Sequence, residues 1–433
     1  MLQVKAGKGK KSYKIQLDKD VRKYSKESKG AHNLNYYVNA RMKDTDPEDL
    51  LYKAIIIDCR IKKGIDPKTA NTSQSYDYYL HFCGLDRRMD RWIPPERVFP
   101  TGDYIEPEDK KKKKDGHHDD HEEDDHEGMD PNERQAHEDA TKIKTIHWIK
   151  FGKFMAETWY YSPYPDDFQD LECIYYCEFC LQFFSTDPEL KRHIAKCNLV
   201  HPPGNQIYHD EENKMTVWEI DANRHPAYCE NLGYLSKLFL DHKLLLYPID
   251  PFLFFVLCEY DEYGHHIVGY FSKNKYFAKN YNLSCILALP FHQRKGYGKF
   301  LITLSYEISK KESKVGTPER PLSDLGRQAY TAWWTQTIIE YIREQTALNH
   351  PFTLENMSRS TGIMLEDIIE VLEKYKLIKK VHNDHIAMCT DPKILDDLYK
   401  QCGRPSIKVD PQKLKWVPYI DPAREAKELK LQN

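Results

Sequence analysis

The chain has 433 residues, at least twice the size of an ordinary single domain, so several domains are expected. Hydrophobic residues make up 40% of it, which is enough for packed cores and excludes a wholly disordered protein. The sequence has no apolar run long enough to cross a membrane, and its first residues lack the apolar region of a signal peptide. We therefore expect neither a membrane span nor a secreted protein.

The net charge of −3 hides a separation of charges along the chain. Residues 1–30 hold ten Lys or Arg against three Asp or Glu, which makes a basic arm. Residues 106–139 hold 15 acidic and 6 basic residues, so the rest of the chain is net positive. A polyanionic partner is therefore compatible with the near-neutral total.

The first 140 residues indicate a basic arm, a small β-barrel and a linker. After the arm at 1–32, residues 33–100 alternate apolar and polar side chains in short runs at 52–61, 76–85 and 87–93. Such runs between Gly, Asp and Pro predict strands and no long helix. Residues 101–140 are charged and of low complexity, and bury too little apolar surface to fold.

The next two hundred residues alternate strand and helix signals. Apolar runs predict strands at 250–260, 265–272 and 283–290. Helical periodicity follows at 295–312 and again at 325–344, where Ser323 and Asp324 are candidate caps. This order is typical of a mixed α/β or α+β domain. Residues 352–381, followed by HIAMC at 385–389, predict a helix, a turn, a longer helix and a short strand, as in a winged-helix-like module.

The spacing Cys177-x2-Cys180-x12-His193-x3-Cys197 matches a one-zinc ββα finger. The eleven cysteines are odd in number and mostly irregular in spacing, which favours a reducing, intracellular compartment and metal ligation over disulfides. Phe183 or Phe184, with Leu190, falls where a small finger places its apolar residues. Because all four ligand positions are filled, we expect a closed, structural site. Tandem arrays are usual for fingers that read DNA, so a lone finger is interpreted as a folding element.

A second motif runs from Gln293 to Lys299, directly after a predicted strand and directly before a predicted helix. A glycine loop in that place offers backbone N–H groups and the positive end of the helix to an anion. The motif lacks the GK[ST] of a P-loop and the third glycine of the dinucleotide fingerprint. The pyrophosphate of a carrier such as coenzyme A is the best remaining ligand.

Several long strings resemble the MYST-type histone acetyltransferases in the right order between about Lys142 and Ile407. They are FGKFMAETWYYSPYP, the zinc knuckle, LSKLFLDHK, DPFLFF, GHHIVGYFSK, CILALP, QRKGYGKFLI and TPERPLSDLG. The segment 36–100, ending in YYLHFCGLDRRMDRWI, resembles the chromo-barrel of one branch of that family.

The resemblance implies an α+β fold in four parts. These are the arm at 1–32, a chromo-like barrel at 33–100, the acidic linker at 101–140 and a GNAT-like mixed α/β acetyltransferase domain at 141–420. Within the last part lie an embedded C2HC zinc finger at 172–200, an acetyl-CoA core at 230–345 and a helical, winged-helix-like part at 346–420.

The resemblance also implies roles for particular residues. Glu319 matches the family's general base, Cys285 its active-site cysteine, and Lys243 a lysine that becomes autoacetylated near the end of a predicted helix. The residues implied to bind acetyl-CoA are Ile286, Leu287 and Ala288 on a strand, Gln293, Arg294, Lys295, Gly296, Tyr297, Gly298 and Lys299 in the loop, and Ser323 beyond it. NLSCILALP stands where the family tends toward NVACILTLP, a departure that removes no ligand or catalytic group.

The chemistry fits such an activity. A lysine amine with a pKa near 10.4 is almost wholly protonated at neutral pH, so attack on a thioester needs a base. Glu319 lies between Pro318 and Arg320-Pro321, a rigid setting for that base. Cys285 in an apolar strand is more often a buried hydrophobe than a nucleophile, so direct attack by the amine is favoured over an acyl-enzyme.

The resemblance further implies acetyl-CoA as co-substrate, one structural zinc ion, tails of histone H4 and of 2A-type histones in nucleosomes, other subunits of a multiprotein complex, and the nucleus. The barrel aromatics could cage a methylated lysine or, with neighbouring Arg residues, contact nucleic acid weakly; both interpretations stay open. The aromatics are Tyr36, Tyr37, Tyr52, Tyr76, Tyr78, Tyr79 and Trp92. The alternatives are a chromatin-binding scaffold with an inactive transferase domain and a single-finger DNA-binding factor.

Overall fold

The computed structural model describes residues 34, 36–47, 50–66, 69–70, 72–104, 142–169, 171–241, 243, 245, 248–276, 280–380, 386–403 and 407–419. The basic arm and nearly all of the predicted linker lie outside these residues. The chain divides into two compact units, residues 1–144 with 159–161 and residues 145–158 with 162–433. None of the helices in the described part is long and apolar enough to cross a membrane.

The first unit is a five-stranded antiparallel sheet in the order β4-β3-β2-β1-β5. Its strands are β1 (Tyr36–Ala40), β2 (Tyr52–Ile61), β3 (Tyr76–Phe82), β4 (Arg91–Ile93) and β5 (Val98–Tyr104). The run predicted at 87–93 is a strand only in its second half. A 3-10 turn occupies Arg87–Met89 because the Asp86 side chain accepts the Arg88 backbone N–H and caps that turn. The core gathers inward-facing residues such as Val38, Ile56 and Leu80.

The second unit is built on a five-stranded sheet in the order β10-β11-β12-β13-β15. Its strands are β10 (Asn205–Asp210), β11 (Met215–Asp221), β12 (Phe252–Asp261), β13 (Gly264–Asn274) and β15 (Ile286–Ala288). Every neighbouring pair is antiparallel. The predicted strands at 250–260 and 265–272 are confirmed as β12 and β13, which are joined by a tight turn at Gly264 (φ 142°).

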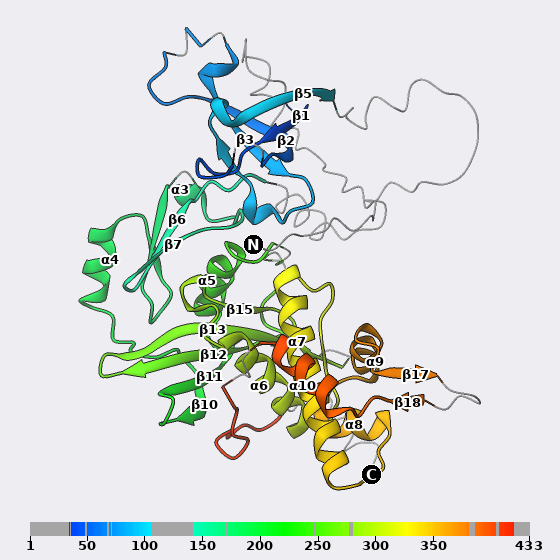
Figure 1. Ribbon diagram of the computed structural model, residues 1–433. Coiled ribbons are helices and arrows are strands. Elements are labelled where there is room, and N and C mark those ends of the chain that lie inside the picture. Colours follow the sequence, from blue (N-terminus) through cyan, green and yellow to red (C-terminus); the bar gives the residue numbers. More distant parts are fainter. Residues whose placement is uncertain are drawn as a thin grey trace, which may run out of the picture. The chain divides into compact units, whose positions relative to one another are not determined.

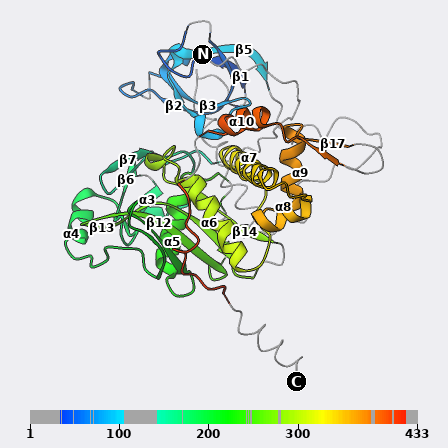
Figure 2. The same ribbon diagram turned by 60° about the horizontal axis from the view of Figure 1, so that its bottom comes forward.

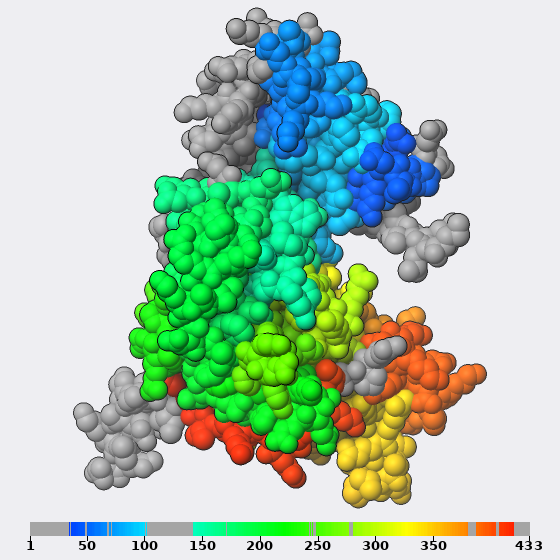
Figure 3. All heavy atoms as spheres, turned by 90° about the vertical axis from the view of Figure 1, so that its left-hand side faces the viewer, coloured from blue at the N-terminus to red at the C-terminus, as the bar shows by residue number. Residues whose placement is uncertain are grey.

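One face of this sheet packs against helix α6 (Tyr297–Lys311). Alternate residues of β12, such as Phe255, share a core with Phe300 and Leu304 of that helix. The C-terminal segment 407–419 completes this core through Leu414 and Trp416, and it lies as a red strip on the green core in Figure 3. Figure 1 shows α5 (Pro226–Lys237) on the opposite side of the sheet from α6.

A second core lies between the other side of α6 and the C-terminal helices. Ile302 and Tyr306 of α6 pack there with Trp334 and Ile338 of the long helix α7. The elements are α7 (Asp324–Ala347), α8 (Leu354–Thr361), α9 (Leu365–Lys374), β17 (Ile378–Lys380), β18 (Ile386–Met388) and α10 (Pro392–Gln401). Figure 2 shows α7, α8 and α9 grouped beside α6. The predicted order of helix, turn, longer helix and strand is confirmed, and α10 is an addition to it.

A third layer of the second unit carries the cysteine and histidine motif. It is a four-stranded sheet in the order β7-β6-β8-β9 with two short helices. The elements are β6 (Trp148–Phe151), β7 (Phe154–Glu157), α3 (Asp166–Gln169), β8 (Cys173–Tyr176), β9 (Phe183–Phe184) and α4 (Asp187–Ile194). Helix α4 starts where Thr186 and Glu189 form a capping box.

The strand predicted at 283–290 is two strands that diverge. β14 (Tyr281–Leu283) pairs in parallel with β16 (Thr317–Pro318), whereas β15 pairs with β13. The direction changes at Ser284 and Cys285, where Ser272 holds the chain through both its backbone and its hydroxyl. The continuous apolar run concealed this break, because periodicity does not show which neighbour a strand pairs with.

Candidate active site and zinc site

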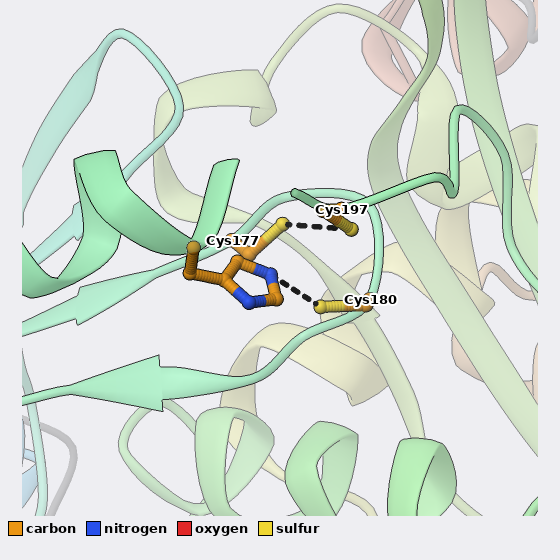
Figure 4. Close-up of side chains that lie close together, drawn as sticks. Cys177, Cys180 and Cys197 are labelled. Atoms are coloured by element: carbon orange, nitrogen blue, oxygen red, sulfur yellow. Dashed lines mark hydrogen bonds between the residues drawn. The ribbon is translucent and has the colours of Figure 1, made fainter. Parts of the chain in front are cut away.

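The four predicted metal ligands come together in the third layer. The ligand atoms of Cys177, Cys180, His193 and Cys197 all lie within 4.8 Å of one another, and this is the only such group in the described part of the chain. The Sγ atoms of Cys177 and Cys197 are 4.0 Å apart, close to the ~3.8 Å that a tetrahedral zinc with 2.3 Å bonds to sulfur requires. Figure 4 shows the three cysteines around the imidazole ring. Three thiols and one imidazole supply the four donors of a tetrahedral ion, which fits a closed structural zinc site.

The zinc knuckle is joined to the turn between β12 and β13. His266 bonds through Nδ1 with Glu178 Oε2 at 2.8 Å and through Nε2 with Asp261 Oδ1 at 3.0 Å. These two carboxylates outweigh the effect of burial and raise the pKa of His266. At Gly264 a Cβ atom would lie 2.4 Å from the carbonyl oxygen of Val200. The backbone of the turn is therefore in close contact with the backbone that follows the finger. The finger is therefore packed against the central sheet of the second unit.

Cys285 lies at the point where β14 and β15 diverge. Its side chain is half-buried, and its Sγ is 3.8 Å from the ammonium of Lys243. The sequence placed Cys285 inside one apolar strand, but the residue is in the gap between two strands. Because β14 and β15 pair with different strands, Cys285 itself belongs to neither strand.

Lys243 lies beyond a helix, contrary to the prediction that placed it near a helix end. Helix α5 ends at Lys237. The chain then turns back, and the Lys243 side chain lies near Gly233 of that helix. Burial disfavours the Lys243 ammonium, but the neighbouring Cys285 and Tyr270 more than offset this and raise its pKa. The Lys243 ammonium thus lies beside Cys285, and Tyr270 is a neighbour that the sequence analysis did not identify.

Among the strands of the described residues, β15 pairs with β13 alone, so its other edge has no partner strand there. The Cys285 carbonyl accepts the Ser272 N–H at 2.8 Å, and the Leu289 N–H donates to the Val268 carbonyl at 3.0 Å. Because antiparallel bonding alternates, Leu287 also faces β13. The backbone groups of Ile286 and Ala288 therefore point away from β13, where an extended ligand could add itself as another strand.

The Ala288 carbonyl on this edge accepts the Gln293 side-chain amide at 3.0 Å. Gln293 thus fastens the glycine loop to the strand.

The glycine loop ends in a helix N-terminus without a side-chain cap. Gly296 is the N-cap, in the left-handed region (φ 99°), so the N–H groups of the first turn have no capping side chain. A Cβ atom built on Gly298 meets nothing within 4 Å, which shows open space in front of that turn. Arg294 and Lys295 are exposed beside it. A 15-residue helix with this N-terminus suits a pyrophosphate.

Besides Gln293, three residues predicted to bind the cofactor are engaged elsewhere through their side chains. The Tyr297 hydroxyl donates to Glu259 Oε1. The Lys299 ammonium donates to Gln336 Oε1 at 2.7 Å and to the Cys402 carbonyl at 2.9 Å. The Ser323 hydroxyl is the N-cap of α7 and accepts the Gly326 N–H at 3.0 Å. For Lys299 the prediction therefore depends on its backbone N–H, since its charge is turned inward.

Glu319 directly follows strand β16. Its N–H donates to the Leu283 carbonyl on β14 at 2.8 Å, and the Thr317 N–H donates to the Asn280 carbonyl at 3.0 Å. Glu319 is half-buried. The two strands bring it to the same end of β14 as Cys285, although 33 residues separate them in the sequence. The backbones of Glu319 and Cys285 thus both lie at the end of β14 from which β15 starts.

The aromatic rings of the first unit are mostly covered. Tyr76, Tyr78 and Tyr79 are buried. The Lys53 ammonium lies 3.9 Å above the ring of Tyr37, and the Arg60 guanidinium lies 4.3 Å from that of Trp92. The protein's own cations thus cover one face of each of these two rings.

Comparisons with known proteins agree with this arrangement. Residues 201–414 match the MOZ/SAS family, residues 143–197 the MYST family zinc finger domain, and residues 32–99 the family described as "RNA binding activity-knot of a chromodomain".

Full-length relatives cover most of the chain. "Histone acetyltransferase of the MYST family 2" of Arabidopsis thaliana is 43% identical over 80% of this chain and 79% of its own length. "Histone acetyltransferase Tip60 homolog" of Caenorhabditis elegans is 34% identical over 92% of this chain and 93% of its own. "Histone acetyltransferase ESA1" of Saccharomyces cerevisiae is 35% identical over 79% and 86%. The chain therefore belongs to the MYST family.

Proposed function

We propose that this protein is a histone acetyltransferase that transfers acetyl from acetyl-CoA to lysine ε-amines of nucleosomal histone tails, with Glu319 as the general base. One observation carries the proposal. Where β14 and β15 diverge, the open edge of β15 leads from Cys285 toward the uncapped start of α6, and Glu319 stands at the same end of β14. The site thus offers a place for an extended thioester arm, an anion site at one end and a base at the other.

The extended arm of the co-substrate is held by the backbone groups of Ile286 and Ala288, as an added strand would be. Its pyrophosphate is held by the N–H groups of Tyr297, Gly298 and Lys299 at the start of α6. The exposed Arg294 and Lys295 add positive charge there. These contacts place the thioester carbonyl near Cys285.

The amine attacks that carbonyl only as a free base. Glu319 accepts the proton as the C–N bond forms, the C–S bond breaks, and the thiol of coenzyme A leaves. The hydrogen bond from the Glu319 N–H to Leu283 fixes the backbone of the base against the strand that leads to Cys285. Direct attack needs no covalent intermediate, and we assign Cys285 the role of lining the reaction site.

Lys243 is the residue on which we expect self-acetylation. Its ammonium is next to Cys285, where the acetyl group arrives, and its raised pKa means that it too needs a base before it can react. Peptide mapping should find acetyl-Lys243 in the wild-type protein and none in a Glu319→Gln variant.

Histone substrates and a chromatin context follow from the family, and we propose finer assignments. These are tails of histone H4 and of 2A-type histones, action within a multiprotein complex, and localisation in the nucleus. For the first unit we propose weak nucleic-acid contact over methyl-lysine binding, because Lys53 and Arg60 cover the rings of Tyr37 and Trp92 and supply positive charge.

The test is mass-spectrometric mapping of lysines acetylated on nucleosomes by the full chain with acetyl-CoA. The proposal predicts acetylation that depends on Glu319, concentrated on the tails of histone H4 and of 2A-type histones. Binding of acetyl-CoA without turnover would instead support the scaffold alternative. The matched control is Asp396→Asn, because it breaks the ion pair with Arg343 between α7 and α10, a pair to which the mechanism assigns no role.

A further inference from the structure

Helix α9 carries a buried carboxylate that reaches the chain beside Glu319. Asp367 is 2% exposed, and its Oδ1 accepts the Nη2 of Arg320 at 2.7 Å. Burial raises the pKa of the Asp367 carboxyl, and the Arg320 guanidinium acts in the opposite direction. A side chain of α9 therefore reaches the residue that directly follows Glu319.

The two sides of this segment are held by different elements. Backbone hydrogen bonds attach Thr317 and Glu319 to strand β14, whereas the side chain of Arg320 is attached to α9. The position of Glu319 is thus set on one side by the strand that leads to Cys285. On the other side it depends on the ion pair with Asp367.

The Arg320 guanidinium would weaken Glu319 as a base if it lay beside the Glu319 carboxylate. Consecutive Cα atoms are 3.8 Å apart, and a guanidinium is always charged in proteins. An opposite charge within 4–6 Å of a carboxylate stabilises its ionised form and makes it a weaker base. The Arg320 side chain is 39% exposed, so it has room to turn toward Glu319 unless something holds it.

We propose that Asp367 is a positioning residue for the general base: it holds the Arg320 guanidinium on α9 and so keeps this cation off the Glu319 carboxylate. The inference rests on the proposed role of Glu319. Asp367 acts through Arg320 and touches neither substrate. A neutral residue at 367 would free the guanidinium to pair with the base.

Other charged and titratable groups face this pair. Glu370 on α9 accepts from Arg320 at 3.4 Å and also lies 3.7 Å from Arg327 of α7. Burial raises the pKa values of Tyr306 on α6 and Tyr330 on α7, so both stay neutral at neutral pH. Asp367 is the buried member of the cluster, and its replacement removes the shortest contact to Arg320.

The experiment is a pH–rate profile of the full chain on a histone tail peptide at saturating acetyl-CoA. For Asp367→Asn we expect the acid limb of kcat to move to lower pH by roughly one unit and kcat at neutral pH to fall at least about threefold. The KM for acetyl-CoA should stay unchanged, because Asp367 is not placed on the cofactor edge. Asp396→Asn, the matched control, should leave the profile in place.

The double variant Asp367→Asn/Arg320→Gln separates positioning from folding. It should return the acid limb to its wild-type place and recover kcat to within about twofold of Arg320→Gln alone, since no freed cation remains. An unmoved acid limb in Asp367→Asn, or a double variant as slow as Asp367→Asn, would overturn the inference.

A Glu319→Gln variant, measured in the same way, separates a failure of the proposed base from a failure of the proposed role of Asp367. Full activity of Glu319→Gln would remove the proposed base itself. An inactive Glu319→Gln with an unmoved acid limb in Asp367→Asn would remove only the role of Asp367.

Discussion

At the residue scale, Gly298 should decide whether a phosphate can approach the N-terminus of α6. Its position has free space where a Cβ would be, yet a phosphate close to the backbone N–H groups would fill that space. Gly298→Ala should therefore stabilise the free protein, by about 0.5 kcal/mol, since glycine is a poor helix former. It should also raise the KM for acetyl-CoA roughly tenfold with kcat retained.

Thermal unfolding without ligand and steady-state kinetics measure the two effects separately. An unchanged KM in Gly298→Ala would show that no phosphate approaches this turn. The KM for the histone peptide is the internal control and should not move.

Residue types and spacing predicted the individual groups well and their surroundings less well. The four zinc ligands follow from spacing because a ββα finger is local in sequence. The inward turn of Lys299 depends on Gln336 and Cys402, and the neighbours of Lys243 include Tyr270; such partners lie far along the chain, so no local pattern reveals them.

At the scale of elements, the spacing between β13 and β15 determines the position of the β15 edge that is proposed to bind acetyl-CoA. A Cβ on Gly269 would lie 2.6 Å from the Leu287 carbonyl oxygen and 3.1 Å from the Ala288 Cα, so Gly269→Ala must push β15 outward. We expect a loss of about 1–3 kcal/mol of stability and a higher KM for acetyl-CoA.

The matched control is Val268→Ala, one residue away. It leaves a cavity in the core shared with α6 without displacing β15, so it should lose similar stability with the KM unchanged. Equal KM values in the two variants would contradict the role given to the β15 edge.

The contact between the zinc knuckle and the β12–β13 turn should depend on pH. Because its two carboxylates raise the pKa of His266, the protonated ring stabilises the fold. This stabilisation is complete below the ordinary histidine pKa and is lost as the pH rises through the raised one. With zinc saturating, His266→Gln should lower the Tm by a degree or two at pH 6 and by less at pH 8.5, since the ring is partly exposed. An equal or larger loss at pH 8.5 would contradict the assignment.

The elements themselves were predictable where one period dominates. Helices α6 and α7 and strands β12 and β13 follow from amphipathic or apolar runs. The split of β14 from β15 was not predictable, because it depends on pairing with β13 and β16. Strands β10 and β11 carry polar residues on a largely buried sheet. Helix α5 begins at Pro226 and ends at Lys237, before the helix end that the sequence indicated near Lys243.

At the scale of the whole molecule, the separation of charges should appear in salt dependence. Residues 1–30 of the basic arm hold ten Lys or Arg, whereas the whole chain has a net charge of only −3. Replacing four arm lysines by Gln should weaken nucleosome binding. It should also reduce the slope of log affinity against log salt, by up to about 0.9 for each phosphate that the arm no longer neutralises. Turnover of a free histone peptide should not change. A loss of peptide turnover would show that the arm serves the active site.

In the proposed mechanism Glu319 is the base that starts acetyl transfer, and the rates of three proteins across pH provide the strictest test of that role. Initial rates on a histone tail peptide should be measured at saturating acetyl-CoA for wild type, Glu319→Gln and Cys285→Ser across neutral and alkaline pH. We predict that Glu319→Gln loses roughly a hundredfold or more at neutral pH and recovers part of it as the amine loses its own proton, with acetyl-CoA binding intact. Cys285→Ser should keep substantial turnover. An active Glu319→Gln beside an inactive Cys285→Ser, with acetyl-Cys285 forming rapidly and stoichiometrically without amine, would contradict the account.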